Sequence, residues 1–280
     1  MAAVLVSVII PAYNRSSMIL CAVDSVLNQT FRNFELIVVD DGSTDQIGSV
    51  LAPYLDRLTL VRQPHAGVSA ARNHGISKSQ GRLIAFLDSD DYWLPEKLDA
   101  QTNFFKENPE AMICQTGETW YRRGRRVNPG RRHCKPSGDI FLPSLELCLV
   151  SPSAVMMRRE LFDCVGVFDE DLPACEDYDL WLRIAALWPV HLVDQPLVVK
   201  TGGHPDQLSS TTIGLDQYRV RALAKILEAD VLTPEQAKAA RAELARKARI
   251  YGHGCLKRGR TYEGERYFNL ARQNETAMVG

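Results

Sequence analysis

The chain of 280 residues lacks the features of several protein classes. Its 33 lysines and arginines nearly balance 34 aspartates and glutamates, so no whole-chain charge indicates a nucleic-acid partner. No uncharged apolar stretch approaches the roughly 18 residues of a membrane span. The first apolar run lacks the basic residues of a signal peptide and ends at Pro11, which favours a strand. A hydrophobic fraction of 45% excludes a disordered chain and predicts a sizeable buried core.

The cysteines also lack a pattern. None of the 7 forms a C-x-x-C pair, so neither a structural zinc site nor a disulfide framework is expected. They are interpreted as small buried side chains in a reducing compartment, which predicts a cytoplasmic protein. Peripheral contact with the inner face of a membrane is the alternative location.

The near-neutral total hides an uneven distribution of charge. Residues 1–214 carry a net charge of −6, whereas residues 215–280 carry +5. We therefore predict an acidic main domain over 1–214 and a helical extension over 215–280. Within the main domain, we expect two halves, residues 1–110 and residues 111–214.

Apolar runs alternate with helical patterns through the first hundred residues. They predict four strands, at Val4–Ile10, Glu35–Val39, Leu58–Val61 and Leu83–Leu87. The first run is rich in β-branched residues, which is typical of a strand buried on both faces. The alternation predicts an α/β fold of three layers with a mostly parallel central sheet.

Polar residues follow three of these strands. Ligands of open parallel sheets bind outside the carboxyl ends of the strands, so these segments are expected to form one site. The segments are Pro11–Arg15, Asp40–Asp45 and Asp88–Asp91.

The remainder of the chain is less regular and then helical. Short strands are expected at Ala154–Met157 and Val190–Val193, and a helix at Asp177–Trp188. Three C-terminal helices are expected at Tyr218–Ala229, Pro234–Cys255 (with Thr233 as its cap) and Tyr262–Gln273.

The acidic segment Asp88-Ser89-Asp90-Asp91 is the strongest chemical signal. Clustered carboxylates repel one another unless a cation compensates them. Mg²⁺ or Mn²⁺ would do so with oxygen ligands, water and substrate phosphate. The alternative is that these acids simply favour the start of the following helix.

Other motifs leave two interpretations open. Asp41 could accept hydrogen bonds from a base or ribose, or its segment could cap a helix. Arg72 could bind a phosphate or pair with a carboxylate of the acidic loops. The acids of Glu176–Arg183 could stabilise a helix start, or one could act as a general base. The basic segment Tyr121–Lys135 is expected to be a loop, either simply solvated or facing an acceptor or membrane.

Five segments in this order closely resemble the family 2 glycosyltransferases, which have the GT-A fold. The segments are Val6–Arg15, Val38–Asp45, Gly67–Gly75, Phe86–Asp91 and Glu176–Arg183. The resemblance covers roughly residues 4–205. It implies an inverting, metal-dependent transfer from a nucleotide-diphosphate sugar, expected to be a UDP-sugar, to an acceptor hydroxyl. Residues 1–110 would then bind the nucleotide sugar and residues 111–214 the acceptor.

The resemblance also implies roles for individual residues. Donor-binding residues would be Pro11, Ala12, Tyr13, Arg15, Asp41, Arg72, Asp88 and Ser89. Asp90 would bind Mn²⁺ or Mg²⁺, with His204 as a further ligand. Asp177 would be the catalytic base, with Glu176 as second choice, and Ser153 and Trp181 would border the acceptor.

The implied partners are the sugar donor and a saccharide or lipid-linked acceptor, in bacterial surface polysaccharide or glycoconjugate synthesis. The C-terminal helices could form a homo-oligomer. The alternative function is a nucleotide-sugar-binding scaffold without catalysis. A haloacid-type phosphatase is excluded because Val39 stands at its nucleophile position, and a nicotinamide dehydrogenase because Pro11–Arg15 replaces its glycine-rich turn.

Overall fold

A computed structural model describes residues 3–128, 130, 133–203 and 212–278. The chain divides into two compact units. Unit 1 comprises Met1–Gly138, Leu149–Pro173 and Pro189–His204, and unit 2 comprises Asp139–Cys148, Ala174–Trp188 and Pro205–Gly280. The expected boundary at residue 214 differs from this grouping, since the segment around Asp177 belongs with the C-terminal helices. A separate domain over 215–280 stays a prediction.

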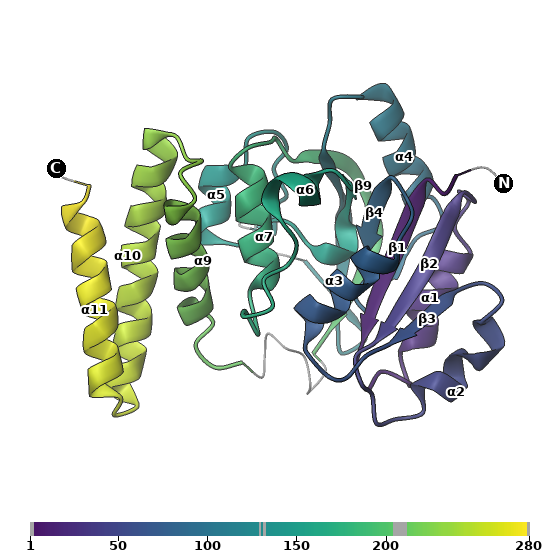
Figure 1. The fold of residues 1–280 in the computed structure, drawn as a ribbon, viewed down its shortest axis with the longest axis horizontal. Helices are drawn as coiled ribbons and strands as arrows, with labels where there is room; N and C mark the ends of the chain where they lie inside the picture. Colours follow the sequence, from purple (N-terminus) through teal and green to yellow (C-terminus); the bar gives the residue numbers. More distant parts are fainter. Residues whose placement is uncertain (1–2, 129, 131–132, 204–211, 279–280) are drawn as a thin grey trace. The chain divides into compact units, whose positions relative to one another are not determined.

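Unit 1 is built on one sheet with the strand order β3-β2-β1-β4-β8-β6-β9-β5, and β7 pairs with β6 (Figure 1). The strands are β1 Val6–Ala12, β2 Phe34–Asp40, β3 Thr59–Arg62, β4 Leu83–Phe86, β5 Tyr92–Trp93, β6 Ile113–Arg122, β7 Arg125–Val127, β8 Val155–Arg158 and β9 His191–Gly202. The first four strands pair in parallel, as predicted. The strand β8 joins β4 to β6 in antiparallel pairing, while β6 and β9 run parallel. The predicted α/β fold is confirmed.

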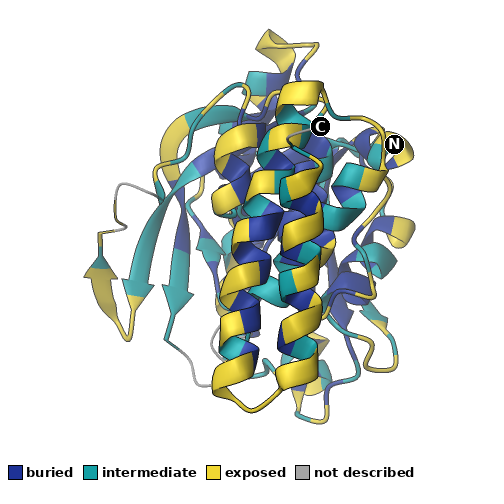
Figure 2. Cartoon of the chain, turned by 90° about the vertical axis from the view of Figure 1, so that its left-hand side faces the viewer, coloured by how far each residue is buried: buried dark blue, intermediate teal, exposed yellow. Residues whose placement is uncertain are grey.

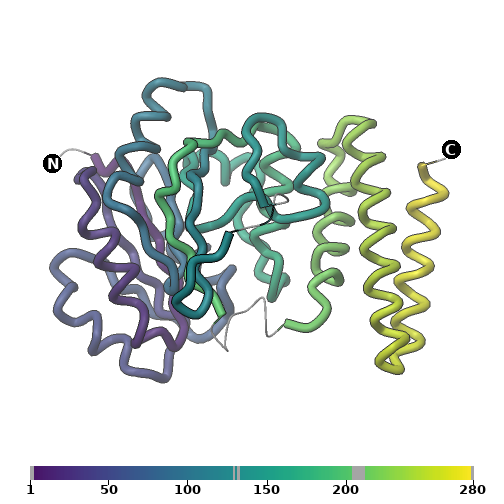
Figure 3. Tube along the Cα trace, turned by 180° about the vertical axis from the view of Figure 1, so that it is seen from behind, coloured from purple at the N-terminus to yellow at the C-terminus, as the bar shows by residue number. Residues whose placement is uncertain are grey.

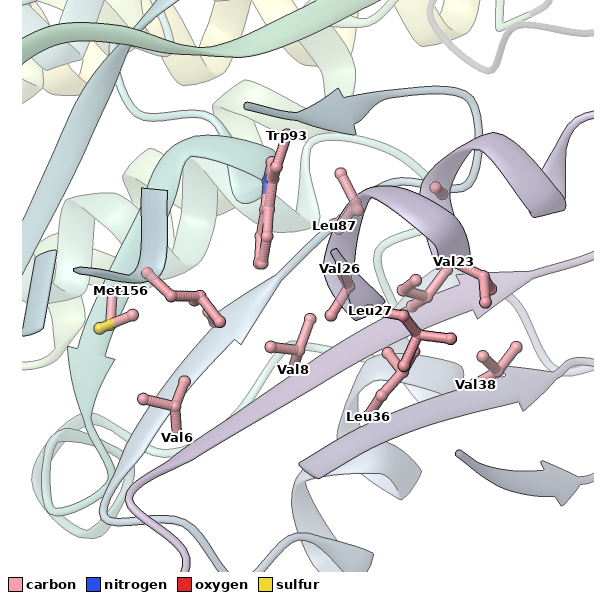
Figure 4. Packing of buried hydrophobic residues seen from close by; sticks show 14 of the residues in the cluster. Val6, Val8, Val23, Val26, Leu27, Leu36, Val38, Leu87, Trp93 and Met156 are labelled. Carbon is pink, nitrogen blue, oxygen red and sulfur yellow. The ribbon is translucent and has the colours of Figure 1, made fainter. Parts of the chain in front are cut away.

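The helices of unit 1 cover this sheet. They are α1 Ile19–Leu27, α2 Ile47–Leu51, α3 Val68–Lys78, α4 Lys97–Glu107 and α6 Leu161–Val165, with 3₁₀ turns η1 Ala52–Tyr54 and η3 Pro152–Ala154. Alternate residues of β1 serve the two faces of the sheet. Val6 and Val8 pack in the cluster that includes Val23 and Val26 of α1, and all four are fully buried (Figure 4).

The opposite face of β1 explains a glycine in α3. A methyl group added at Gly75 would lie 2.4 Å from Cγ2 of Ile9. This separation is too short for any side chain, so the glycine allows α3 to approach β1 closely. The small residues of this helix therefore bring the neighbouring Arg72 near the carboxyl edge of the sheet.

The basic segment is not the expected loop over its first part. The strand β6 extends to Arg122, and β7 returns from Arg125 in antiparallel pairing. Arg123 (φ 51°) and Gly124 (φ 74°) form the two-residue connection between them. Positive φ at both central residues matches the right-handed twist of a hairpin, and this turn signal was missed in the sequence.

Unit 2 contains α5 Phe141–Glu146, α7 Glu176–Ala185, α9 Asp216–Glu228, α10 Pro234–Lys257 and α11 Thr261–Thr276. The cap of α10 is confirmed: Thr233 Oγ accepts from Gln236 N, and the Gln236 side chain accepts from Thr233 N. Helices α10 and α11 lie side by side in opposite directions, and Figure 2 shows their exposed outer faces (Figures 2 and 3). In the described parts of the chain, no helix has the length and hydropathy needed to span a membrane.

Candidate functional site

The acidic loop Asp88–Asp91 follows β4, and its first carboxylate, Asp88, forms an ion pair with a buried arginine. Arg72 Nη2 of α3 donates to Asp88 Oδ1 at 2.8 Å. The Arg72 side chain is 4% exposed and its guanidinium lies over the ring of Phe168. Burial acts to raise the pKa of Asp88, but the charges of Arg72 and Lys200 outweigh it and hold that pKa below its usual value. Asp88 is therefore an ionised, oriented group.

The last carboxylate of the loop, Asp91, is an internal anchor. Its Oδ2 accepts from Ser153 Oγ at 2.6 Å and its Oδ1 from Thr201 N at 3.0 Å. Lys200 Nζ lies 3.9 Å from Oδ2. Burial nevertheless raises the pKa of Asp91 to about 7. Strand β9 thus ties the acidic loop to the sheet through two consecutive residues.

The middle carboxylate, Asp90, fits the metal-binding role best. Burial and the neighbouring charge of Asp88 raise the pKa of Asp90, so a cation beside it would relieve a real repulsion. Within the described residues, no three histidine, cysteine or acidic side chains are arranged to hold a metal together. A cation here would take its other ligands from water and a substrate diphosphate, which suits Mg²⁺ or Mn²⁺. His204 lies outside the described residues.

Ser153 does not occupy the place expected of an acceptor contact. It is fully buried in η3, where its hydroxyl donates to Asp91 and accepts from Asp88 N at 3.1 Å. Its carbonyl accepts from Trp93 Nε1 at 2.8 Å. Since no part of Ser153 reaches the surface, we correct its assignment to support of the acidic loop. Ser89 is also buried, with 8% of its surface exposed.

The carboxylate of Asp41 is surrounded by nitrogen atoms of the chain itself. Gln63 Nε2 and Ala66 N donate to Oδ1 at 2.7 and 2.9 Å, and Gly67 N donates to Oδ2 at 2.9 Å. His65 Nδ1 lies 2.9 Å from Oδ2. These contacts occupy the lone pairs of the carboxylate. The expected direct bond from Asp41 to a nucleobase therefore does not fit this arrangement, and the residue instead holds the loop that enters α3.

That loop carries half of an aromatic platform. The ring of His65 stacks on Tyr13 with centroids 3.9 Å apart and planes inclined by 21°. Tyr13 is 40% exposed. Pro11 and Ala12 are buried in β1, so they position Tyr13 and do not border a base with their own side chains. The stack is the exposed group at this end of β1 that suits a planar ligand.

Polar bonds fix the segment after Tyr13. Asn14 adopts φ 52°, its N–H donates to Ser43 Oγ, and its Oδ1 accepts from Thr44 N at 2.8 Å. Ser16 N donates to Asp45 Oδ2 at 2.8 Å. Arg15 is half-buried between these two bonded positions. The loops after β1 and β2 therefore form one rigid edge.

The rest of the motif in α3 is structural. Asn73 Nδ2 donates to the carbonyl of Phe168 at 2.9 Å, and Asn73 Oδ1 accepts from Phe168 N at 3.0 Å. His74 Nδ1 lies 2.8 Å from Gln63 Oε1. Arg72, Asn73 and His74 thus each join a different neighbouring loop to α3, and the pairing interpretation of Arg72 is the one that the contacts support.

Unit 2 carries the predicted base at the start of α7. Asp177 is half-exposed, its Oδ1 accepts from Tyr178 N at 2.7 Å, and Cys148 Sγ lies 3.6 Å from its Oδ2. Cys175, with φ 61°, turns the chain into the helix. Tyr178 Oη donates to the carbonyl of Leu145 at 2.6 Å, which fixes α7 to α5. Asp177 is therefore an oriented carboxylate at a helix N-terminus.

The neighbouring acids of this motif differ in exposure. Glu176 is 5% exposed and Asp179 1% exposed. Asp179 Oδ2 accepts from Arg183 Nη2 at 2.7 Å and from Lys225 Nζ at 3.2 Å, so this acid links α7 to α9. Trp181 is 2% exposed. We therefore correct its assignment as an acceptor contact, since it belongs to the packed face of α7.

Sequence reasoning missed the contribution of β9 and of α5. Lys200 and Thr201 brace the acidic loop, yet only Val190–Val193 was predicted as strand there. The apolar run Leu197–Val199, which directly precedes Lys200, was the available signal. Cys148 was interpreted only as a buried thiol, because nothing in the spacing relates it to Asp177.

Comparisons with known proteins agree with this geometry. The family described as Glycosyl transferase family 2 matches residues 7–166. Escherichia coli UDP-Glc:alpha-D-GlcNAc-diphosphoundecaprenol beta-1,3-glucosyltransferase WfaP is 34% identical over 64% of this chain and 70% of its own.

Two solved structures share the fold. That of S. aureus TarS 1–349 in complex with UDP-GlcNAc superposes with a TM-score of 0.70 at 20% identity, over 96% of this chain and 92% of that one. Pyrobaculum calidifontis mannosyltransferase PcManGT in complex with GDP-Man and Mn²⁺ gives 0.62 at 20% identity, over 95% and 85%. Both are GT-A transferases. Because the family match covers more than half of the sequence and includes the acidic loop, the chain belongs to glycosyl transferase family 2 and is a glycosyltransferase.

Proposed function

We propose that this enzyme transfers glucose, with inversion, from UDP-glucose to a hydroxyl of a saccharide linked through diphosphate to a lipid. The E. coli relative carries this donor and acceptor in its name and is 34% identical. Such a reaction belongs to bacterial surface polysaccharide synthesis, at the cytoplasmic side of the membrane. The observation that carries the proposal is the acidic loop, whose outer acids are braced and whose middle acid, Asp90, has a pKa raised by burial and by the charge of Asp88.

The donor would lie along the carboxyl edge of β1, β2 and β4. The Tyr13–His65 stack offers a flat surface to a uracil ring, and Asp41 keeps His65 in place. Asp88, held ionised by Arg72, would accept hydrogen bonds from ribose or sugar hydroxyls. Arg15 and Ser89 would complete the donor contacts.

Asp90 would hold Mn²⁺ or Mg²⁺ together with the donor diphosphate, and His204 remains a proposed further ligand. When bound, such an ion stabilises the charge that develops on the departing diphosphate. The chain's own part is to keep a hard oxygen ligand in position, and the bonds of Asp91 to Ser153 and Thr201 do this. A metal is thus proposed as a joint ligand of protein and substrate.

Asp177 would accept the proton of the acceptor hydroxyl. Its Oδ1 accepts from Tyr178 N at 2.7 Å, whereas the contact of Oδ2 with the Cys148 thiol, at 3.6 Å, is weaker, so Oδ2 is the atom that would take the proton. Glu176 is the second candidate, although its burial makes direct access harder. A positioned carboxylate of this kind contributes about 10²–10⁴-fold to a transfer reaction.

The test is transfer by the purified chain with UDP-glucose, Mn²⁺ and a short-chain GlcNAc-diphospholipid, measured as UDP release and as product. Asp177→Asn is expected to lower kcat by about 10³-fold, while the increase in Tm that UDP causes should be unchanged. Asp90→Asn is expected to lose the part of this Tm increase that depends on Mn²⁺. Asp194→Asn, an exposed acid of β9, is the matched control.

Three outcomes contradict parts of the proposal. Near-wild-type transfer by Asp177→Asn removes that residue as the base. Stabilisation by UDP-glucose without UDP release favours the scaffold alternative. A Tm increase caused selectively by a different nucleotide sugar would mean that this sugar, and not UDP-glucose, is the donor.

A further inference from the structure

The end of β6 and the start of β7 concentrate positive charge on a short hairpin. Arg122, Arg123, Arg125 and Arg126 are all exposed, and we call residues 122–126 the basic hairpin. The segment 119–128 contains no acidic residue. The nearest acid along the strand, Glu118, is buried and lies 3.2 Å from Lys135 Nζ. None of the four arginines takes part in an ion pair with the described residues.

The pairing register places like charges opposite each other. Arg122 pairs with Arg125 across the two strands. Like charges at directly opposed positions destabilise a sheet, because the side chains lie close together. A hairpin that keeps such a pair is stabilised by any anion that binds between the two guanidinium groups.

The hairpin is anchored and is not a free loop. Arg123 N donates to the carbonyl of Gly202 at 3.2 Å. At Gly203 an added methyl would lie 3.1 Å from Cγ of both Arg122 and Arg123, so the arginine stems cross the end of β9 where no side chain stands. The backbone of the hairpin and the first part of the Arg122 and Arg123 side chains are therefore held in place, which lowers the entropy lost on binding.

We propose that the basic hairpin binds the anionic phospholipid surface of the membrane. The inference rests on the proposed function, because a lipid-linked acceptor lies at such a surface. Arginine pairs with phosphate groups through two parallel hydrogen bonds, and the arginines of the hairpin offer several such contacts. Nucleic acid offers the same phosphate chemistry, but the proposed transfer to a lipid-linked acceptor brings the enzyme to a membrane surface, so the membrane is the partner that we propose.

The test is co-sedimentation of the full chain with phosphatidylcholine vesicles with and without phosphatidylglycerol. Binding is expected only to the anionic vesicles and is expected to weaken as salt increases. Arg125→Gln with Arg126→Gln should lower the partition constant about 25-fold, or about fivefold for each arginine. Lys78→Gln with Lys106→Gln removes the same charge from exposed sites on α3 and α4 and should leave binding within about twofold.

Equal losses in the two double variants would overturn the proposal, as would equal binding to neutral and anionic vesicles. Tighter binding to duplex RNA than to vesicles of equal phosphate content would assign the hairpin to nucleic acid. No donor is present in these measurements, so their failure is separate from failure of the proposed transfer. An unchanged Tm and unchanged transfer to a short-chain acceptor in the arginine variant would show that the fold is retained.

Discussion

Arg72 Nη2 and Asp88 Oδ1 lie 2.8 Å apart, and this pair joins a helix of small residues to the loop that follows β4. The arginine is almost wholly buried, whereas the Asp88 side chain is 27% exposed. The Asp88 carboxylate is therefore accessible from solvent, while the fold holds its cationic partner in the interior.

Replacing Arg72 by methionine should destabilise unit 1 by about 2–3 kcal/mol, since it leaves a carboxylate without its partner. Asp88 has a lowered pKa in the folded chain, so its contribution to stability is present above the unfolded pKa of 3.8 and is lost as the pH falls through the folded value. The gap between wild type and variant should close as the solution is acidified. Urea denaturation near neutral pH and at lower pH measures both effects, and a gap independent of pH would contradict this account.

Gly75→Ala should destabilise the chain by about 1–3 kcal/mol, because the new methyl would overlap with Ile9 Cγ2. Gly48→Ala is the matched control, since a methyl there meets no atom within 4 Å. That control in α2 should be neutral or stabilising by a few tenths of a kcal/mol. Combining Gly75→Ala with Ile9→Ala should cost less than the sum of the two single changes, and strict additivity would argue against the contact.

Lys97 in α4 has no exposed surface, and its Nζ donates to Gln101 Oε1 at 2.7 Å above the ring of Trp93. Burial lowers the pKa of Lys97 from 10.5 to about 7. Between these two values the unfolded chain binds more protons, so stability rises with pH by about 1 kcal/mol per pH unit. Below the pKa of Lys97 in the folded chain, the loss of stability caused by burying its charge is complete and no longer changes with pH.

Lys97→Met removes this dependence. The variant should be more stable than wild type near neutral pH. This difference in stability should shrink as the pH approaches 10.5, the pKa of lysine in the unfolded chain. Thermal denaturation across this range measures it. A parallel pair of stability curves would show that Lys97 is charged in the folded chain at all these pH values.

The contact of Cys148 with Asp177 predicts an effect on the rate of transfer. Cys148→Ser keeps a hydrogen-bond donor beside Asp177 Oδ2 and should keep kcat within about twofold of wild type. Cys148→Ala removes that donor and should lower kcat by up to about tenfold, because the carboxylate is less firmly oriented. Cys164→Ala, at an exposed thiol, is the control. Equal kcat values for all three variants would mean that the thiol does not orient the proposed base.

The sequence predicted the elements that are repetitive and local. The β-branched run of β1 and the Thr233 cap needed only short-range patterns, and both stand where expected. What could not be predicted depends on contacts between distant segments. Ser153 looks like an exposed polar residue until η3 places it beneath Asp91, and Trp181 looks available until its helix packs. The hairpin at Arg123 was missed because its turn depends on a left-handed arginine.

Four nitrogen atoms between Gln63 and Gly67 surround the Asp41 carboxylate, so the loop that carries His65 is ordered by the chain itself. Ordering a backbone costs about 1–2 kcal/mol per residue, and here folding has already met that cost before any ligand arrives. Under the proposed function, docking of a base on the Tyr13–His65 stack would be a rigid-body encounter, and its rate would follow diffusion and orientation instead of loop closure. A base of the wrong shape would meet a surface that does not adapt to it.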